Sequence, residues 1–410
     1  MAHMTGRIYL DHAATTPVSR EALAAMTPYF GSYNPSSLHA EGRAARAALE
    51  TARGSVARCI GATPREIVFT GGGSEANNLA IVGAARAARA ARAELGTGFP
   101  THIVTVATEH HAVLHAAAAL ADDGFAVTVL AVDGAGRLDP GIFAAALRPE
   151  TALAAVMVAN NEIGTLQPVA ELARTARESG VLFHTDAVQA AGRLALDVAV
   201  LGIDLLALSA HKCGGPKGVG ALYVRAGTPL EARLVGGPQE AGRRAGTENV
   251  AGIVGFARAL ADATAALDTE PARVRALRDR FEATCLARIA GTHVNGRAAA
   301  RLPNVSSIAF TGVAAPELLV RLDLAGVAVS TGSACAAGSA EPSHVVAALH
   351  AEPWIRDGTV RFSLGTSTSE QDVELVAETL SEIIAAIRVA AGNVGIETPG
   401  LFTSPSEVRS

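Results

Sequence analysis

Residues 204–220 read Asp204-Leu-Leu-Ala-Leu-Ser-Ala-His-Lys-Cys-Gly-Gly-Pro-Lys-Gly-Val-Gly220. The apolar run predicts a buried strand that ends at Ser209 and passes into a Gly/Pro loop carrying Lys212. The chain has two lysines, Lys212 and Lys217, among its 34 Lys and Arg residues. Arginine stays protonated, whereas a partly desolvated lysine can lose its proton and act as a nucleophile. We therefore expect the chemistry of this protein at Lys212.

A nucleophilic lysine of this kind is typical of enzymes that bind pyridoxal phosphate (PLP) as a Schiff base. Such a site needs a phosphate cradle and a carboxylate beside the pyridine nitrogen. Ser209 and His211 flank Lys212, and Asp186 lies upstream in an apolar segment, residues 181–189. The alternative reading is that Lys212 caps a loop and Asp186 ends a strand.

A glycine loop follows a second predicted strand. Residues 66–70 are largely apolar, and Gly71-Gly-Gly-Ser-Glu-Ala76 leads into an alanine-rich helix. Glycines let the backbone approach an anion, which the N–H groups at a helix N-terminus attract. The same letters match G-x-G-x-x-A, so a dinucleotide-binding oxidoreductase is a remote alternative. The fingerprint also needs an acidic residue about 20 positions later at the end of a second strand, and the chain does not supply one there, since Glu109 falls too late.

Strands and helices alternate between residues 102 and 209, which predicts an α/β fold with a largely parallel sheet. We expect a large domain over residues 17–259 and a smaller α+β domain formed by residues 4–16 and 260–390. Residues 391–410 read as a flexible tail. Ligands gather at the carboxyl ends of parallel strands. Gly73, Asn161, Asp186 and Ser209 each lie at or just past the carboxyl end of a predicted strand of this chain.

Composition narrows the class of protein. A net charge of -5 and no basic run argue against a nucleic-acid partner. Hydrophobic residues make up 49%, but their runs are too short to span a membrane. No signal sequence follows Met4, which we take as the native start. The four cysteines (Cys59, Cys213, Cys285 and Cys335) form no CxxC pair, so we expect a reducing, cytoplasmic setting.

Histidines and one cysteine add further candidates. His111 and His115 lie one helical turn apart, but no carboxylate or cysteine ligand is near, so we expect no metal. His110 at a strand end is suited to stacking on a flat cofactor ring and to proton transfer. Residues 330–345 are small and carry Cys335 at their centre, where a thiol is free to react. The alternative for Cys335 is an inert residue in a turn.

Nine ordered motifs together point to one family. They are Leu10–Pro17, Asn34–Ser37, Thr108–Leu114, Asn160–Gly164, Asp186–Gln189, Ser209–Lys212, Arg244–Asn249, Ser330–Cys335 and Val360–Gly365. In these motifs the chain resembles the PLP-dependent cysteine desulfurases of the NifS/IscS type, from Tyr9 to about Ala390. The resemblance implies PLP fold type I, similar to aspartate aminotransferase, and a homodimer. It also implies that sulfur is removed from L-cysteine and passed to an acceptor protein, an iron–sulfur scaffold or another.

The resemblance assigns roles to individual residues. Lys212 would hold PLP, His110 would stack on the ring and move protons, and Cys335 would attack the substrate sulfur. Asp186 would pair with the pyridine nitrogen, while Gln189 and Asn161 would face the ring hydroxyl. The phosphate of PLP would be bound by Gly73, Ser74, Ser209, His211 and the partner subunit's Thr247. The carboxylate of the substrate would be bound by Asn34 and Arg361.

Some positions and the exact substrate stay open. Pro238 and Ala241 depart from the usual Gly-Gly-Gly-Gln-Glu-Arg run, which leaves the shape of that loop in doubt. Cys213 beside Lys212 is an unexpected thiol and a minor rival to Cys335 as nucleophile. The same chemistry would also suit a selenocysteine lyase or another PLP-dependent β-lyase.

Overall fold

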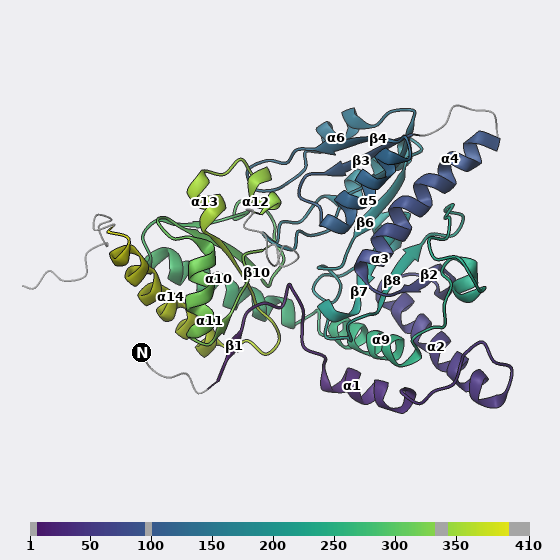
Figure 1. The fold of residues 1–410 in the computed structure, drawn as a ribbon, viewed down its shortest axis with the longest axis horizontal. Coiled ribbons are helices and arrows are strands. Elements are labelled where there is room, and N and C mark those ends of the chain that lie inside the picture. The colour runs from purple at the N-terminus through teal and green to yellow at the C-terminus, as the bar shows by residue number, and fades with distance from the viewer. Residues whose placement is uncertain (1–5, 95–100, 333–342, 393–410) are drawn as a thin grey trace, which may run out of the picture.

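The computed structural model describes residues 6–94, 101–332 and 343–392, and its largest element is a seven-stranded sheet (Figure 1). In sheet order the strands are β2 (Ile67–Thr70), β8 (Gly220–Val224), β7 (Leu205–Ser209), β6 (Leu182–Asp186), β5 (Thr151–Ala155), β3 (His102–Val106) and β4 (Ala126–Leu130). β8 runs antiparallel to both neighbours, and all other neighbouring strands are parallel. The predicted α/β class with a mainly parallel sheet is confirmed.

Helices cover both faces of this sheet, so its strands are buried on both sides except the edge strand β4, in which Ala126 and Val129 are exposed. In β3, Val104 packs in the same core as Leu49 and Phe256, whereas its neighbour Ile103 packs on the opposite face with Val113. The first face is covered by α2 (Ala40–Cys59), α6 (Pro140–Ala146), α7 (Val169–Glu178), α8 (Val198–Leu201) and α9 (Val250–Ala265), and the second by α3 (Gly73–Asn78), the π-helical turn η3 (Leu79–Gly83), α4 (Ala84–Glu94) and α5 (His111–Asp122).

A second, antiparallel sheet contains β12 (Thr359–Ser363), β10 (Val305–Phe310) and β9 (Thr292–Val294) in that order. One face packs against α10 (Glu270–Arg288), α11 (Ala315–Leu324) and α14 (Glu370–Ala390), with Phe281 and Leu380 beside Phe362. On the other face Ala309 packs with residues of α12 (His344–Ala348) and α13 (Pro353–Gly358). This sheet therefore has its own hydrophobic core.

The N-terminal segment joins the two sheets, as Figure 1 shows in purple. β1 (Ile8–Tyr9) pairs in parallel with β11 (Val327–Ala328), and Asp11 then bridges to Ser363 of β12. The chain continues to α1 (Arg20–Met26), which packs on α9. Short 3-10 helices complete the structure: η1 (Thr27–Tyr29), η2 (Pro64–Glu66), η4 (Ala210–Lys212) and η5 (Gln239–Gly242).

The predicted strands and helices from residue 102 to 209 are present, with ends that differ by a few residues. The sequence analysis did not predict β8, β9, β11, α12 or α13, which are short elements. No single helix within the described ranges is long and apolar enough to cross a membrane, and one bent pair, α9 with α10, passes that test by length and composition only. The domain limits proposed above stay a prediction.

A buried ion pair fixes the loop in which Pro238 and Ala241 depart from the family pattern. Arg53 of α2 binds both carboxylate oxygens of Glu240, at 2.6 and 2.7 Å, and the backbone N–H of Phe69 donates to the same carboxylate at 2.9 Å. Glu240 and Ala241 both have positive φ, 50° and 55°. The pair therefore holds a strained turn against the edge strand β2.

Removing the carboxylate of this pair will leave the buried Arg53 guanidinium with the exposed Glu50, 3.2 Å from its Nε, as its remaining acidic partner among the described residues. We predict that Glu240→Ala lowers the free energy of unfolding by roughly 3–5 kcal/mol, as for other broken buried pairs. Urea unfolding at pH 7 measures the change. Glu317→Ala, which breaks an exposed pair with Arg321, serves as the control and should cost about 0.5 kcal/mol or less. Equal losses in the two variants would contradict the prediction.

Candidate functional site

A cavity of about 280 Å³ lies where the carboxyl ends of the parallel strands face the second sheet. Parallel strands bring residues that follow their carboxyl ends to one edge, which explains why segments distant in sequence meet here. Ten of the residues singled out from the sequence line this cavity: Gly73, Ser74, His110, Asn161, Asp186, Gln189, Ser209, His211, Lys212 and Arg361.

Lys212 lies at the end of η4, one turn beyond β7. Its Nζ donates to the backbone carbonyl oxygens of Ala13 and Ala14, each at 2.7 Å. The turn is tight, because a Cβ on Gly215 would lie 2.9 Å from the carbonyl oxygen of Ala210. The glycine-rich loop thus allows the close fold that presents the lysine to the cavity.

Asp186 ends β6 and is nearly fully buried in the cavity wall. Its Oδ2 accepts a hydrogen bond from Nδ2 of Asn77 at 2.7 Å, and its Oδ1 accepts one from the backbone N–H of Val188 at 2.8 Å. Donors to both oxygens stabilise the charged form and fix the plane of the carboxylate. The carboxylate is therefore held in one orientation.

His110 is the N-cap of α5, and its Nδ1 accepts a hydrogen bond from the backbone N–H of Ala112 at 3.0 Å. Burial and the charge of Lys212 lower its pKa, while Asp186 opposes them. The neutral ring is therefore favoured. Since Nδ1 is occupied as an acceptor, the proton of this ring is on Nε2. His110 accordingly presents a proton donor.

The glycine loop and the Lys212 loop form a second hollow next to the cavity, lined by Gly72, Gly73, Ser74, Ser209 and His211 among others. Gly72 has φ +152°, and a Cβ on Gly220 would lie 2.7 Å from the Gly72 backbone, so this approach requires glycine. Burial and nearby cations, Lys212 first, lower the pKa of His211 to about 4. The hollow thus offers hydroxyls, a neutral imidazole and the backbone at the start of α3.

The sheet topology also tests the alternative hypothesis that the glycine loop binds a dinucleotide. A dinucleotide fingerprint needs a parallel strand, helix and strand unit around the loop. β2, which precedes Gly71, is an edge strand that pairs with the antiparallel β8. The loop therefore lacks the sheet context of that fingerprint, and the oxidoreductase alternative has no structural support.

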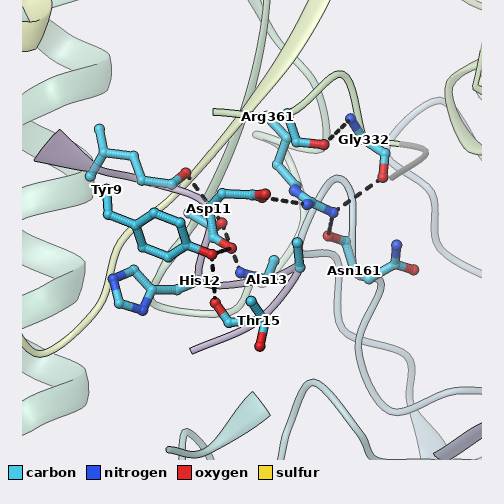
Figure 2. Close-up of polar contacts among 12 residues, drawn as sticks. Tyr9, Asp11, His12, Ala13, Thr15, Asn161, Gly332 and Arg361 are labelled. Carbon is cyan, nitrogen blue, oxygen red and sulfur yellow. Dashed lines mark hydrogen bonds and ion pairs between the residues drawn. The ribbon is translucent and has the colours of Figure 1, made fainter. Parts of the chain in front are cut away.

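Arg361 lies at the boundary between the two sheets, with its guanidinium at the meeting point of three segments (Figure 2). It donates to Oδ1 of Asp11 at 2.8 Å, to the carbonyl oxygen of Asn161 at 3.0 Å and to that of Gly332 at 3.2 Å. Its Nε–H has no partner among the residues that the structure describes. The guanidinium thus keeps donor capacity beyond its structural contacts.

Two of the predicted site residues are not brought together with the rest in this chain. Asn34 and Thr247 are exposed and do not line the cavity of this chain. The Oδ1 of Asn34 instead accepts from the backbone N–H of Ser36 at 2.9 Å. Cys335 lies outside the described residues. The roles of these three residues stay predictions.

The sequence analysis missed several residues that shape the site. Asn77, Glu162 and His344 line the cavity, and Asp11 holds Arg361. Burial raises the pKa of Glu162, whose Oε2 accepts from the hydroxyl of Ser343 at 2.5 Å. Their positions in the sequence could have indicated two of these residues, because Asn77 follows the glycine loop by one helical turn and Glu162 follows Asn161.

The histidines near the cavity form a group of rings without a metal geometry. His111 stacks on His115 with ring centroids 5.1 Å apart and lies 4.4 Å from His344. Within the part of the chain that the structure describes, no group of three or more His, Cys, Asp or Glu side chains is placed to hold a metal ion. These contacts are ring packing in the wall of the cavity.

Comparison with known proteins identifies the family. A model described as aminotransferase class-V matches residues 8–376, and the chain therefore belongs to this family. The cysteine desulfurase IscS of Dictyoglomus turgidum is 46% identical over 389 residues, or 94% of this chain and 96% of that protein. A solved NifS-like protein aligns with a TM-score of 0.85 at 33% identity, over 93% of this chain and all of that one. Within the class-V family, the chain belongs to the cysteine desulfurases of the NifS/IscS type.

Two buried histidines near the site predict a pH dependence of stability. Burial lowers the pKa of His12 to about 4 and that of His184 to about 3. Their unfolded pKa is about 6.5. Because the unfolded chain binds protons that the folded chain does not, stability will fall as the pH drops from about 6.5 towards about 4.

The test compares wild type with His12→Gln in urea between pH 7.5 and 4.5. We predict a shallower pH dependence for the variant, with a difference of roughly 1 kcal/mol per pH unit below pH 6. Both proteins contain the same other titratable groups, such as Glu109 and Glu162. The difference between their two stability curves therefore reports on His12. Parallel curves for the two proteins would show that His12 is not a buried neutral group.

Proposed function

We propose that this protein is a PLP-dependent cysteine desulfurase, which converts L-cysteine to L-alanine and takes the sulfur as a persulfide on Cys335. One observation carries the proposal. Lys212, Asp186, His110 and Arg361 line a single cavity. A nucleophilic amine, a carboxylate for a pyridine nitrogen and a cation for a substrate carboxylate are the groups that this chemistry requires. The relatives named cysteine desulfurase support it.

The residues present fit PLP, which when bound supplies an electron sink for the bonds at the substrate Cα. Asp186 would face the ring nitrogen, and His110 would stack on the ring. Gln189 has a buried Oε1 without a partner among the described residues, and this acceptor suits the ring hydroxyl together with Asn161. The phosphate would lie in the hollow of Gly73, Ser74, Ser209 and His211, joined by the partner subunit's Thr247.

Lys212 and His110 would share the proton movements. The Nζ of Lys212 lies among backbone carbonyls, at 2.7 Å from two of them, so it is held in place as an ammonium and can exchange a proton with a substrate carbon once it is neutral. His110 carries its proton on Nε2, because Nδ1 accepts from the backbone. In this tautomer His110 can donate a proton from Nε2.

Arg361 would bind the substrate carboxylate. The guanidinium is buried and anchored by Asp11 and by two backbone carbonyls, so it is already oriented before substrate arrives. Its unpaired Nε–H is available to an anion at the cavity. Asn34, which does not line the cavity of this chain, stays the predicted second ligand of that carboxylate.

Sulfur transfer would use the thiolate of Cys335. The thiolate attacks the substrate sulfur, the S–S bond forms as the Cβ–S bond breaks, and the substrate Cβ takes up a proton to give alanine. The three described cysteines are unsuited to this step. Burial raises the pKa of Cys213 and of Cys285 to about 12 and raises that of Cys59 above its usual range, and none of the three lines the cavity.

We also propose a homodimer, a sulfur-acceptor protein as partner and a cytoplasmic location. The exposure of Thr247 supports the dimer, since this residue would reach the phosphate of the other subunit and not that of its own. The free thiols of Cys59, Cys213 and Cys285 support a reducing compartment. An iron–sulfur scaffold is one acceptor to which the persulfide would be passed.

The cofactor assignment is directly testable. We predict that the purified protein is yellow and that borohydride reduction attaches the pyridoxyl group to Lys212, as peptide mass spectrometry will show. Lys212→Ala should not be labelled and should release no alanine from cysteine. Lys217→Ala, which changes the chain's second lysine, is the control and should be labelled like wild type. A colourless protein that retains a nicotinamide cofactor would refute the proposal.

The nucleophile assignment needs a separate test. We predict that Cys335→Ser binds PLP and responds spectrally to cysteine but loses at least about 100-fold in alanine release, because a hydroxyl cannot form a persulfide. Cys213→Ser should retain most of the activity, since its thiol is buried and protonated. If Cys213→Ser lost desulfuration and Cys335→Ser kept it, Cys213 would be the nucleophile. Parallel assays with selenocysteine identify the preferred substrate.

A further inference from the structure

A chain of three polar side chains leads away from the cavity into the core of the large sheet. Asp186 accepts from Nδ2 of Asn77 at 2.7 Å, and Oδ1 of Asn77 lies 2.8 Å from Nε2 of His184. Asn77 and His184 are essentially fully buried. His184 and Asp186 lie two residues apart on β6, so they point to the same face of the sheet, where α3 supplies Asn77.

The positions of the hydrogen atoms follow from the chemistry of the chain. Asp186 ends the chain as an acceptor, so Asn77 must direct its NH₂ group to Asp186 and its oxygen to His184. The His184 ring must then carry a hydrogen on Nε2. Because burial lowers the pKa of His184 to about 3, the ring is neutral and this is its one N–H. A flipped Asn77 amide would direct its oxygen to the carboxylate and its NH₂ group to the Nε2–H of His184, and both contacts are unfavourable.

A second buried carboxyl group makes this orientation important. Glu109 is fully buried, and burial with the charge of Asp186 raises its pKa well above the usual range. Its Oε1 accepts from the backbone N–H of Met157 at 2.6 Å, but its Oε2 has no partner among the described residues. Asp186 has a donor on each oxygen. Asp186 therefore has more hydrogen-bond donors to bind a carboxylate than Glu109 has.

We propose that His184 and Asn77 are positioning residues, which lock Asp186 as an oriented carboxylate towards the ring nitrogen of the bound cofactor. The inference rests on the proposed function, because it concerns the use of Asp186 towards PLP. It adds that a histidine without access to the cavity controls the cofactor through the amide of Asn77. Replacing either residue will let the carboxylate turn or take up the ring proton, so that the ring loses its positive charge.

The measurements are the dissociation constant of PLP and the pH at which the visible absorption band of the bound cofactor changes. We predict that His184→Phe and Asn77→Leu weaken PLP binding about 10-fold, the size of one lost hydrogen bond to a charged group. The pH midpoint of the band should rise by about one unit, because a neutral ring no longer repels the proton on the Lys212 nitrogen. Glu109 interacts with Asp186. The titratable or charged groups that line the cavity with Asp186 include His110, His111, Glu162, His211, Lys212, His344 and Arg361, and all of these remain unchanged in these variants.

Matched controls separate positioning from general damage to the core. His184→Gln retains a donor near the position of Nε2 and should restore most of the PLP affinity and the band position. His102→Phe removes another buried histidine of the same sheet, bonded to Thr151 and Thr128, and should leave both readouts unchanged. Asn78→Ala changes the exposed neighbouring amide and should also behave like wild type.

The double variant His184→Phe with Asn77→Leu decides whether the histidine acts through the asparagine. It should match Asn77→Leu alone, since His184 has nothing to orient once the amide is gone. Additive effects, or a His184→Phe spectrum like that of wild type, would overturn the inference while the PLP assignment stands. A wild-type protein that binds no PLP would overturn the proposed function itself. If His184→Phe does not fold, Asn77→Leu compared with Asn78→Ala decides the question.

Discussion

The buried guanidinium of Arg361 is the constraint on which the cavity depends. Arginine cannot give up its charge, so burial obliges the fold to supply acceptors around it. Here they come from three segments distant in sequence: the Asp11 carboxylate and the carbonyl oxygens of Asn161 and Gly332. Satisfying one side chain thus brings the N-terminal segment and both sheets to a single point, and the cavity is the space left beside it.

The same N-terminal segment holds the lysine. Ala13 and Ala14 follow Asp11 within three residues and direct their carbonyl oxygens to Nζ of Lys212, while Gln189 donates to the carbonyl of Ala13 at 2.9 Å. Any shift of Asp11 therefore moves the acceptors of Lys212 as well. The two cationic groups of the site are coupled through one short stretch of backbone, so the position of each depends on the other.

The sequence predicted the sheet and half of the residues that line the cavity. Gly73, Asn161, Asp186 and Ser209 follow local rules, whereas Gln189 and Arg361 were assigned from the family resemblance. An apolar run followed by glycine or a polar residue marks the carboxyl end of a strand, and parallel strands collect such ends at one edge. Asn77 and Asp11 were not predicted, because their contacts do not follow such local rules. The direction of Asn77 depends on where α3 begins, and Asp11 reaches Arg361 across 350 residues of chain. Such contacts are set by the packing of two sheets, which periodicity does not encode.

Charge in the buried site is allocated by hydrogen-bond donors and not by residue type. Burial raises the pKa of Glu109 and of Glu162, which have few hydrogen-bond donors. His110, His184 and His211 have lowered pKa values for the same reason, the cost of burying a charge. The site therefore favours neutral imidazoles, while the two donors to Asp186 are placed to bind a carboxylate. A single oriented charge beside neutral donors and acceptors polarises a bound ring in one direction, which several competing charges would not do.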